Sequence, residues 1–298
     1  MARCCAAAAA AAAEAARQDV EALLARVPPR SRVAVVSMLG SLCPVTLAHV
    51  RAFDEARRLL LAEPGAAVER PPRLEEFAEC VGLVRLNPDG HVAKKTSQKG
   101  QRAICLEDRA QLVRLAVSGR PWLLYDESGR GAARASAQGL ALLRSRFPNV
   151  TFVHFDMNGA DDVAKYRKWA SAGPNNRMIT MGRPGFTERV QAGIARAGVE
   201  PKHCILGPEL PDISSTAARD ASAAGDVKAL LQLLHPAVAE YLLQRDGWPG
   251  LPEAEAEESP DTPTGSSLTA PEDGPPPAAS PLEEPQAARR RWQAPQSR

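Results

Sequence analysis

Aromatic residues are scarce in this 298-residue chain: Phe, Trp and Tyr together make up 4% of it, although 44% of its residues are hydrophobic. A core with this composition must consist mainly of Ala, Leu and Val. Six cysteines are present, but none has Cys-x-x-Cys spacing, which argues against a structural zinc site. Scattered cysteines are typical of a reduced protein, so we expect a cytoplasmic location. The basic cluster Arg289–Arg291 leaves a nuclear location open.

Three further features are missing. The net charge is only +2, so the chain has no strong field for nucleic acid or a membrane surface. No Gly-x-Gly-x-x-Gly sequence occurs, which disfavours a dehydrogenase-type dinucleotide site. The apolar stretch 4–13 is too short to span a bilayer and lacks the Leu-rich centre of a secretory signal. We therefore expect neither a membrane span nor a nucleic-acid partner.

Short apolar runs alternate with helical patterns through the middle of the chain. The alternation predicts an α/β fold with a Rossmann-like parallel sheet and helices on both of its faces. The expected strands are 32–37, 82–86, 122–125, 150–155, 177–181 and 203–206. The expected helices are 46–61, 106–118, 131–147, 162–172, 185–197 and two after Ser215.

The two ends of the chain differ in composition from the middle. Residues 1–30 begin with an alanine run of high helix propensity, and we expect a helical extension there. Residues 31–246 carry the strand and helix patterns and form the expected catalytic domain. Residues 247–298 are rich in Pro, Glu and Ala and poor in aliphatic side chains, which predicts a disordered tail.

The first candidate site lies where the first expected strand meets a helix. Gly40 and Ser41 form the turn, and Thr46 and His49 lie three residues apart in the first helical turn. Free amides at a helix N-terminus bind phosphate, and a hydroxyl and an imidazole on the same face can donate to its oxygens. An ordinary strand–helix unit with an incidental histidine is the alternative.

A second candidate site precedes a later helix. Ser214, Ser215 and Thr216 supply three hydroxyls, of which Ser214 or Ser215 is a natural N-cap. Arg219 brings a planar fork suited to phosphate. Such hydroxyls also cap helices that bind nothing. Two anion-type helix starts in one α/β chain nevertheless suggest a triphosphate held between them.

The ordered motifs resemble those of nicotinamide/nicotinate mononucleotide adenylyltransferases. Gly40-Ser-Leu-Cys-Pro-Val-Thr-Leu-Ala-His49 is similar to the family's Gly-Ser-Phe-Asn-Pro-x-Thr-x-x-His signature, and Ile213-Ser-Ser-Thr-x-x-Arg219 to its second signature. Between them lie a Lys-Lys loop ending at Lys94 and Lys95, a Gly-Ala-Asp…Trp segment and an Arg-Pro-Gly turn. The resemblance covers roughly residues 31–245.

The resemblance implies adenylyl transfer from ATP to a pyridine mononucleotide, with Mg²⁺ as cofactor held by the ATP phosphates rather than by protein ligands. It implies catalytic roles for His49, Thr46 and Arg219. It implies substrate binding by Gly40, Ser41, Lys94, Lys95, Gly159, Asp161, Trp169, Arg183, Ser214, Ser215 and Thr216. The choice between nicotinamide and nicotinate mononucleotide, and the formation of a homo-oligomer, stay open.

Some positions depart from the family pattern. Leu42 and Cys43 replace the usual Phe-Asn, and Ser128 stands where relatives carry a Trp that stacks on the pyridine ring. Loss of such a platform forfeits about 1 kcal/mol of stacking. The alternatives are another adenylyl- or cytidylyltransferase of the same superfamily, and a non-catalytic nucleotide-binding descendant.

Overall fold

The computed structural model describes residues 2–127 and 135–244, with the backbone alone for 2–10 and 135–137. Six parallel strands form one sheet with the order β3-β2-β1-β4-β5-β6. The strands are β1 (Arg32–Gly40), β2 (Glu79–Leu86), β3 (Leu123–Tyr125), β4 (Thr151–Gly159), β5 (Arg177–Gly182) and β6 (Cys204–Glu209). This is the doubly wound order, in which the direction of winding reverses between β1 and β4.

Ten α-helices and one 3₁₀ helix accompany the sheet within the described part of the chain. The first five are α1 (Ala2–Leu24), α2 (Leu47–Leu61), α3 (Asp89–Ser97), α4 (Leu106–Val117) and α5 (Ala135–Arg146). The others are α6 (Ala160–Tyr166), η1 (Lys168–Ser171), α7 (Thr187–Ala197), α8 (Ser215–Ala223), α9 (Val227–Leu233) and α10 (Pro236–Leu243).

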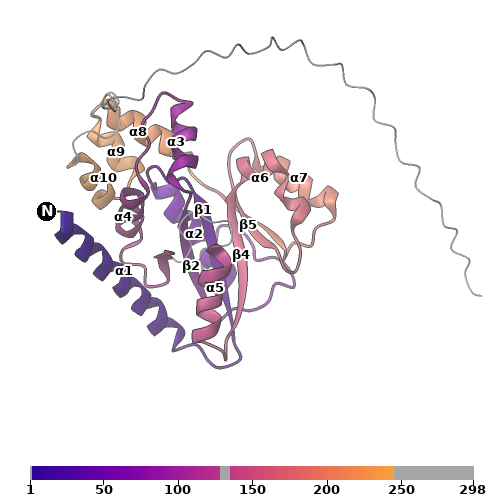
Figure 1. Ribbon diagram of the computed structural model, residues 1–298. Coiled ribbons are helices and arrows are strands. Elements are labelled where there is room, and N and C mark those ends of the chain that lie inside the picture. The colour runs from indigo at the N-terminus through magenta and orange to yellow at the C-terminus, as the bar shows by residue number, and fades with distance from the viewer. Residues whose placement is uncertain (1, 128–134, 245–298) are drawn as a thin grey trace, which may run out of the picture. The chain divides into compact units, whose positions relative to one another are not determined.

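Alternating residues of β1 pack on opposite faces of the sheet, as the two-residue period of a strand requires. Ala34 and Val36 belong to a large apolar cluster with residues of α2, α4 and α8–α10. Val33 and Val35 pack instead with residues of α1 and α5, and Figure 1 shows α5 in front of the sheet. The predicted α/β fold with helices on both faces is therefore confirmed.

All six expected strands are present, and four of them, β1, β2, β4 and β6, extend at least three residues beyond the expected ranges. β1 continues to Gly40 by pairing with β2, and β4 continues to Gly159 by pairing with β5. Polar residues such as Asp156 and Asn158 hide this extension in the sequence. Three helices rather than two follow Ser214, and α3 occupies a stretch that we expected to be a loop.

The expected division between an N-terminal extension and the domain at residue 31 does not divide the core. Val20 and Leu24, at the end of α1, are 2% and 1% exposed and pack against Val33 and Val35. Glu21 forms an ion pair with Arg146 of α5 at 2.7 Å. The last turns of α1 are thus part of the folded domain. The expected tail, 247–298, lies outside the described residues.

Replacing Leu24 by Ala should lower the free energy of unfolding by about 2–5 kcal/mol, because a buried leucine is lost and a cavity is left. Leu23→Ala is the matched control, since Leu23 is only half-buried in the same helix. Urea unfolding of both variants measures the difference. Equal, small losses would mean that α1 does not pack on the sheet.

Candidate active site

A buried arginine holds the loop between β1 and α2. Arg109 of α4 is fully buried, and its Nη1 donates to the carbonyl oxygens of Ser41 and Asn87 at 3.0 and 2.9 Å. Its Nη2 pairs with Asp89 at 2.8 Å. A Cβ on Gly40 would lie 2.9 Å from Cδ2 of Leu42, so a larger residue there would require the Leu42 side chain to shift. No local pattern predicts this role for Arg109, because an arginine on a helix usually faces solvent.

Thr46 and His49 bond to each other at the start of α2. The Thr46 backbone N–H donates to His49 Nδ1 at 3.0 Å, and the Thr46 hydroxyl lies 2.7 Å from the same nitrogen. Nδ1 is therefore an acceptor, and the neutral imidazole carries its proton on Nε2. Thr46 is 1% exposed. Its hydroxyl, expected to face phosphate, instead orients His49 in this structure.

The surroundings of His49 keep its ring neutral. Burial lowers the pKa of His49 to about 4, and the positive charges of Lys95 and Arg183 act in the same direction. A neutral Nε2–H is a hydrogen-bond donor that needs no protonation step near neutral pH. The geometry thus provides one fixed donor beside the N-terminal amides of α2.

The second helix start, that of α8, contacts the first loop directly. Ser214 caps α8 by accepting from the Ala217 N–H at 3.1 Å. The Ser215 hydroxyl donates to the Pro44 carbonyl at 2.8 Å. The first amides of α2 and of α8 have no partners within their helices. Two helix N-termini are therefore linked at the carboxyl edge of the sheet, where ligands bind in such folds.

Arg219 does not reach into an open site. It is 5% exposed, and it donates to the Cys43 carbonyl at 2.5 Å, to Gln101 at 2.7 Å and to Thr216 at 3.2 Å. We expected its fork to face phosphate. In the structure all three guanidinium nitrogens bond within the protein, so Arg219 braces α8 against the loop before α2.

The expected lysines lie on a helix rather than on a mobile loop. Lys94 and Lys95 are exposed in the last turn of α3. Pro88 and Asp89 at its start, with buried Val92 and Thr96 one turn apart, are the helix signals that we missed.

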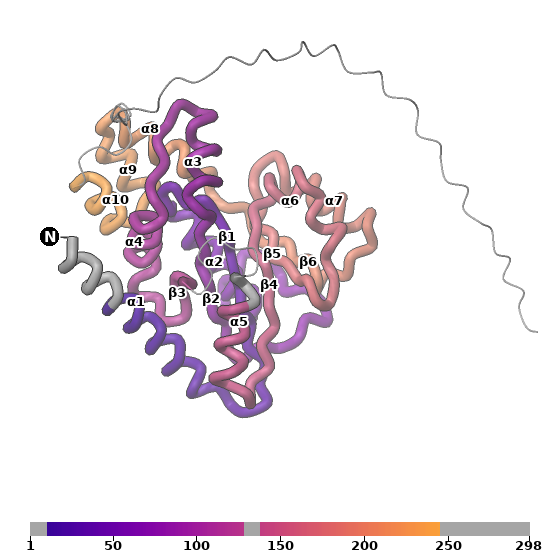
Figure 2. Tube along the Cα trace, in the orientation of Figure 1, coloured from indigo at the N-terminus to yellow at the C-terminus, as the bar shows by residue number. Residues whose placement is uncertain are grey.

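Just beyond α3 the chain approaches α8. Lys99 donates to the Thr216 hydroxyl at 3.0 Å, and Gln101 donates to Asp220 at 2.8 Å. Figure 2 shows α3 beside α8. Neither Lys99 nor Gln101 was among the expected site residues, although both contact the second signature.

The remaining expected residues surround the ends of β4 and β5. Arg183 bridges Asp161 at 3.1 Å and Asp212 at 2.8 Å. Gly159 caps α6 immediately before Asp161. Trp169 packs with the cluster of α6 and α7, so closely that a Cβ on Gly193 would lie 2.5 Å from its ring. In this structure Trp169 therefore packs between helices.

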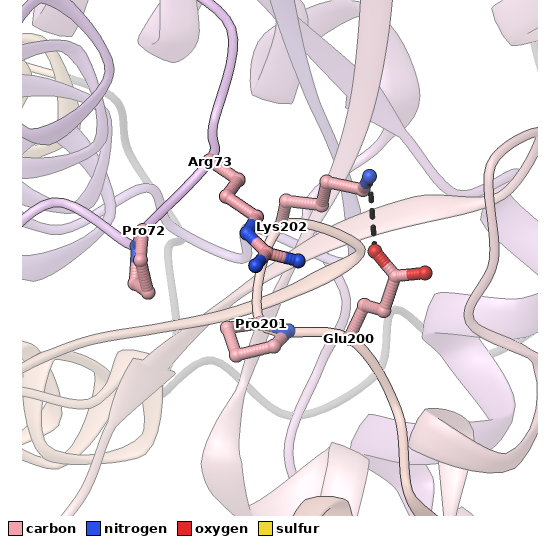
Figure 3. Close-up of a pocket in the computed structure, with 5 residues that line it drawn as sticks. All are labelled: Pro72, Arg73, Glu200, Pro201 and Lys202. Atoms are coloured by element: carbon pink, nitrogen blue, oxygen red, sulfur yellow. Dashed lines mark ion pairs between the residues drawn. The ribbon is translucent and has the colours of Figure 1, made fainter.

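A cavity of about 540 Å³ lies at the opposite end of the sheet. Pro72 and Arg73 precede β2, and Glu200, Pro201 and Lys202 precede β6 (Figure 3). Loops before parallel strands gather at the amino edge, so this cavity is not part of the candidate site. Ser128, where we noted the missing stacking residue, lies outside the described residues.

No family model matches this chain. Comparison with known proteins finds similarity to one curated protein and to a group of solved structures. A probable nicotinate-nucleotide adenylyltransferase of Cereibacter sphaeroides is 32% identical over 114 residues, which is 33% of this chain. The chain spans 60% of that relative's length. The resemblance to mononucleotide adenylyltransferases is thereby confirmed.

The solved structures include the Plasmodium falciparum nicotinic acid mononucleotide adenylyltransferase complexed with NaAD, at 16% identity and a TM-score of 0.46. The alignment covers 72% of this chain and 95% of the Plasmodium falciparum chain. The same enzyme complexed with APC is 16% identical with a TM-score of 0.43, over 72% of this chain and 94% of its own.

The lowered pKa of His49 predicts a pH dependence of stability. The unfolded chain protonates this histidine near pH 6.5 and the folded chain only near pH 4. Between these values the unfolded state binds more protons, so the His49 contribution to stability falls as the pH falls from 6.5 to 4. Nitrogen NMR of the imidazole at pH 6 should show a neutral ring with its proton on Nε2. A ring that titrates near 6.5, or a proton on Nδ1, would contradict this assignment.

Arg219→Lys should lower the free energy of unfolding by about 1–3 kcal/mol, because the single nitrogen of lysine cannot reach the three acceptors that three guanidinium nitrogens reach separately. Arg51→Lys is the control, since the Arg51 side chain is 58% exposed in a loose 3.7 Å pair with Glu55. Chemical unfolding compares the two variants. An Arg219→Lys protein as stable as the control would show that Arg219 is not a brace.

Proposed function

We propose that this chain transfers the adenylyl group of ATP to a pyridine mononucleotide. A phosphate oxygen of the mononucleotide attacks the α-phosphorus of ATP in line, and the bond from that phosphorus to the bridging oxygen of the β-phosphate breaks. The products are NAD or its deamido form and pyrophosphate. The nucleophile is already an anion, so the reaction needs positioned donors rather than a general base.

The observation that carries the proposal is the linkage of two helix N-termini around one fixed imidazole donor. The Ser215 and Arg219 bonds to the Pro44 and Cys43 carbonyls hold α8 against the loop that begins α2. Amides at both helix starts favour negative charge. His49 directs a neutral donor from the first of these helices. A triphosphate between the two helix starts would meet donors from both sides.

Each residue then has a role consistent with its contacts. His49 Nε2 donates to the reacting phosphate region, where charge builds up in the transition state. Lys95, whose charge acts on His49, neutralises substrate phosphate. Thr46 and Arg219 are positioning residues, because their polar groups already bond within the protein.

Mg²⁺ enters this proposal as part of the substrate. No group of three or more His, Cys, Asp or Glu that could hold a metal occurs among the described residues. Donors and cations dominate the two helix starts, which suits a metal carried by the phosphates of ATP. The ion would neutralise phosphate charge there.

The name of the curated relative favours nicotinate mononucleotide as the acceptor. Purified full-length protein should form the dinucleotide and pyrophosphate from ATP, Mg²⁺ and this mononucleotide in a coupled assay. Nicotinamide mononucleotide and a pantetheine phosphate are the parallel acceptors. Turnover of only the pantetheine phosphate would point to a sister nucleotidyltransferase, and binding without turnover would point to a non-catalytic protein.

His49→Ala should lower kcat by about a hundredfold or more, because a positioned donor to transition-state charge contributes roughly 3 kcal/mol. His91→Ala is the control, since His91 is an exposed histidine on α3. Steady-state kinetics and a thermal melt should be measured on both proteins. Near-normal kcat in a folded His49→Ala protein would remove His49 from the mechanism.

A further inference from the structure

A polar cluster lies where β1 and β4 separate. Their pairing ends at Ser37 and Asp156. Beyond this pair β1 continues only alongside β2, and β4 only alongside β5. The separation coincides with the reversal of strand order, the place where ligands bind in open α/β sheets.

Asp156 is held on one side and open on the other. The Ser37 hydroxyl donates to its Oδ1 at 3.0 Å, and Arg85 Nη2 lies 3.5 Å from the same oxygen. Ser37 and Arg85 are 1% and 5% exposed, whereas the Asp156 side chain is 44% exposed. Among the described residues no hydrogen bond or ion pair involves Oδ2.

The protons in this cluster can be assigned. Ser37 has one proton, which goes to Asp156, so its lone pairs accept from Arg85 Nη2 at 3.0 Å and from His154 Nε2 at 2.8 Å. The donor and both acceptor positions of the Ser37 hydroxyl are thereby used. The carboxylate is fixed in orientation, and its second oxygen is left as a hydrogen-bond acceptor.

Stability alone gives no reason for this arrangement. Burying Arg85 costs desolvation energy that the carboxylates of Asp156 and Asp126 offset only in part, and Arg85 Nε has no partner among the described residues. None of the four residues belongs to the two phosphate-binding signatures. The buried guanidinium of Arg85 therefore helps to orient the Asp156 carboxylate at the ligand-binding edge of the sheet.

We propose that Asp156 Oδ2 accepts a hydrogen bond from a ribose hydroxyl of a nucleotide bound at this edge. An ionised carboxylate makes short, strong bonds with hydroxyl donors. It repels phosphate or a pyridine carboxylate. The neutral donors of these nucleotides are the adenine amino group and the ribose hydroxyls, and only the ribose hydroxyls occur in both ATP and nicotinate mononucleotide. The inference rests on the proposed function, and the ribose can come from ATP or from the mononucleotide.

The test compares how tightly wild type and the Asp156→Asn variant bind each nucleotide and its deoxy analogues. Arg85 and Ser37 both present N–H or O–H groups to Oδ1, so the Asn oxygen keeps that position and its amide nitrogen replaces Oδ2. Asp54→Asn is the matched control, since Arg120 holds the Asp54 carboxylate at 2.9 and 3.0 Å on α2. Calorimetry measures the Kd of ATP, of nicotinate mononucleotide and of the 2′-deoxy and 3′-deoxy analogue of each, on the full chain.

Wild type and Asp54→Asn should bind a deoxy analogue of one nucleotide about 10- to 100-fold more weakly than its parent. Asp156→Asn should show a clearly smaller penalty, because its amide N–H offers the hydroxyl oxygen a neutral hydrogen bond in place of the charge-assisted one. The affected nucleotide identifies the ribose. The same penalty in Asp156→Asn as in wild type, or no penalty for either nucleotide, would overturn the inference.

If Asp156→Asn does not fold, Ser37→Ala replaces it, because it removes one of the bonds that orient the carboxylate. The penalty should then shrink, and an unchanged penalty would count against the inference. These affinities do not depend on turnover. Failure of adenylyl transfer is therefore distinguishable from failure of this assignment.

Discussion

Two hydrogen bonds between segments more than 170 residues apart determine the geometry of the candidate site. The Ser215 hydroxyl binds the Pro44 carbonyl, and the Arg219 guanidinium binds the Cys43 carbonyl. Both acceptors lie in the loop that leads into α2, and both donors lie in the first turns of α8. Without these bonds the two helix N-termini would be separate features of the fold.

The same bonds change the meaning of the second signature. Its hydroxyls and its arginine are used largely to connect the protein to itself: Ser214 caps the helix, Ser215 reaches the first loop and Arg219 braces both. What remains for a ligand is the backbone amides of the helix starts, the His49 donor and the lysines near them. Anion binding by such a site depends on fixed dipoles, which need no rearrangement when charge develops.

The sequence predicts the sheet well, because its buried parallel strands are short apolar runs separated by helical patterns. It also identifies the two helix starts, whose capping residues have a chemical signature. The sequence does not reveal which way a side chain points in the folded protein. Arg219 is marked by its motif, yet its inward orientation follows from tertiary contacts that lie far away in the chain.

Residues without any local signal were missed altogether. Arg109 resembles a surface arginine in its helix, although it is fully buried beneath the first loop. Asp156 follows an apolar stretch and would be taken for the first loop residue, but β4 continues past it. Its contact with Ser37 requires the strand order, which single-sequence patterns do not supply.

A crystal structure of the full chain with a non-hydrolysable ATP analogue and Mg²⁺ tests the central claim most directly. We predict phosphate oxygens within hydrogen-bonding distance of His49 Nε2 and of backbone amides in the first turns of both α2 and α8. A triphosphate bound at only one of these helices, or at the cavity beside Lys202 at the other end of the sheet, would contradict the account.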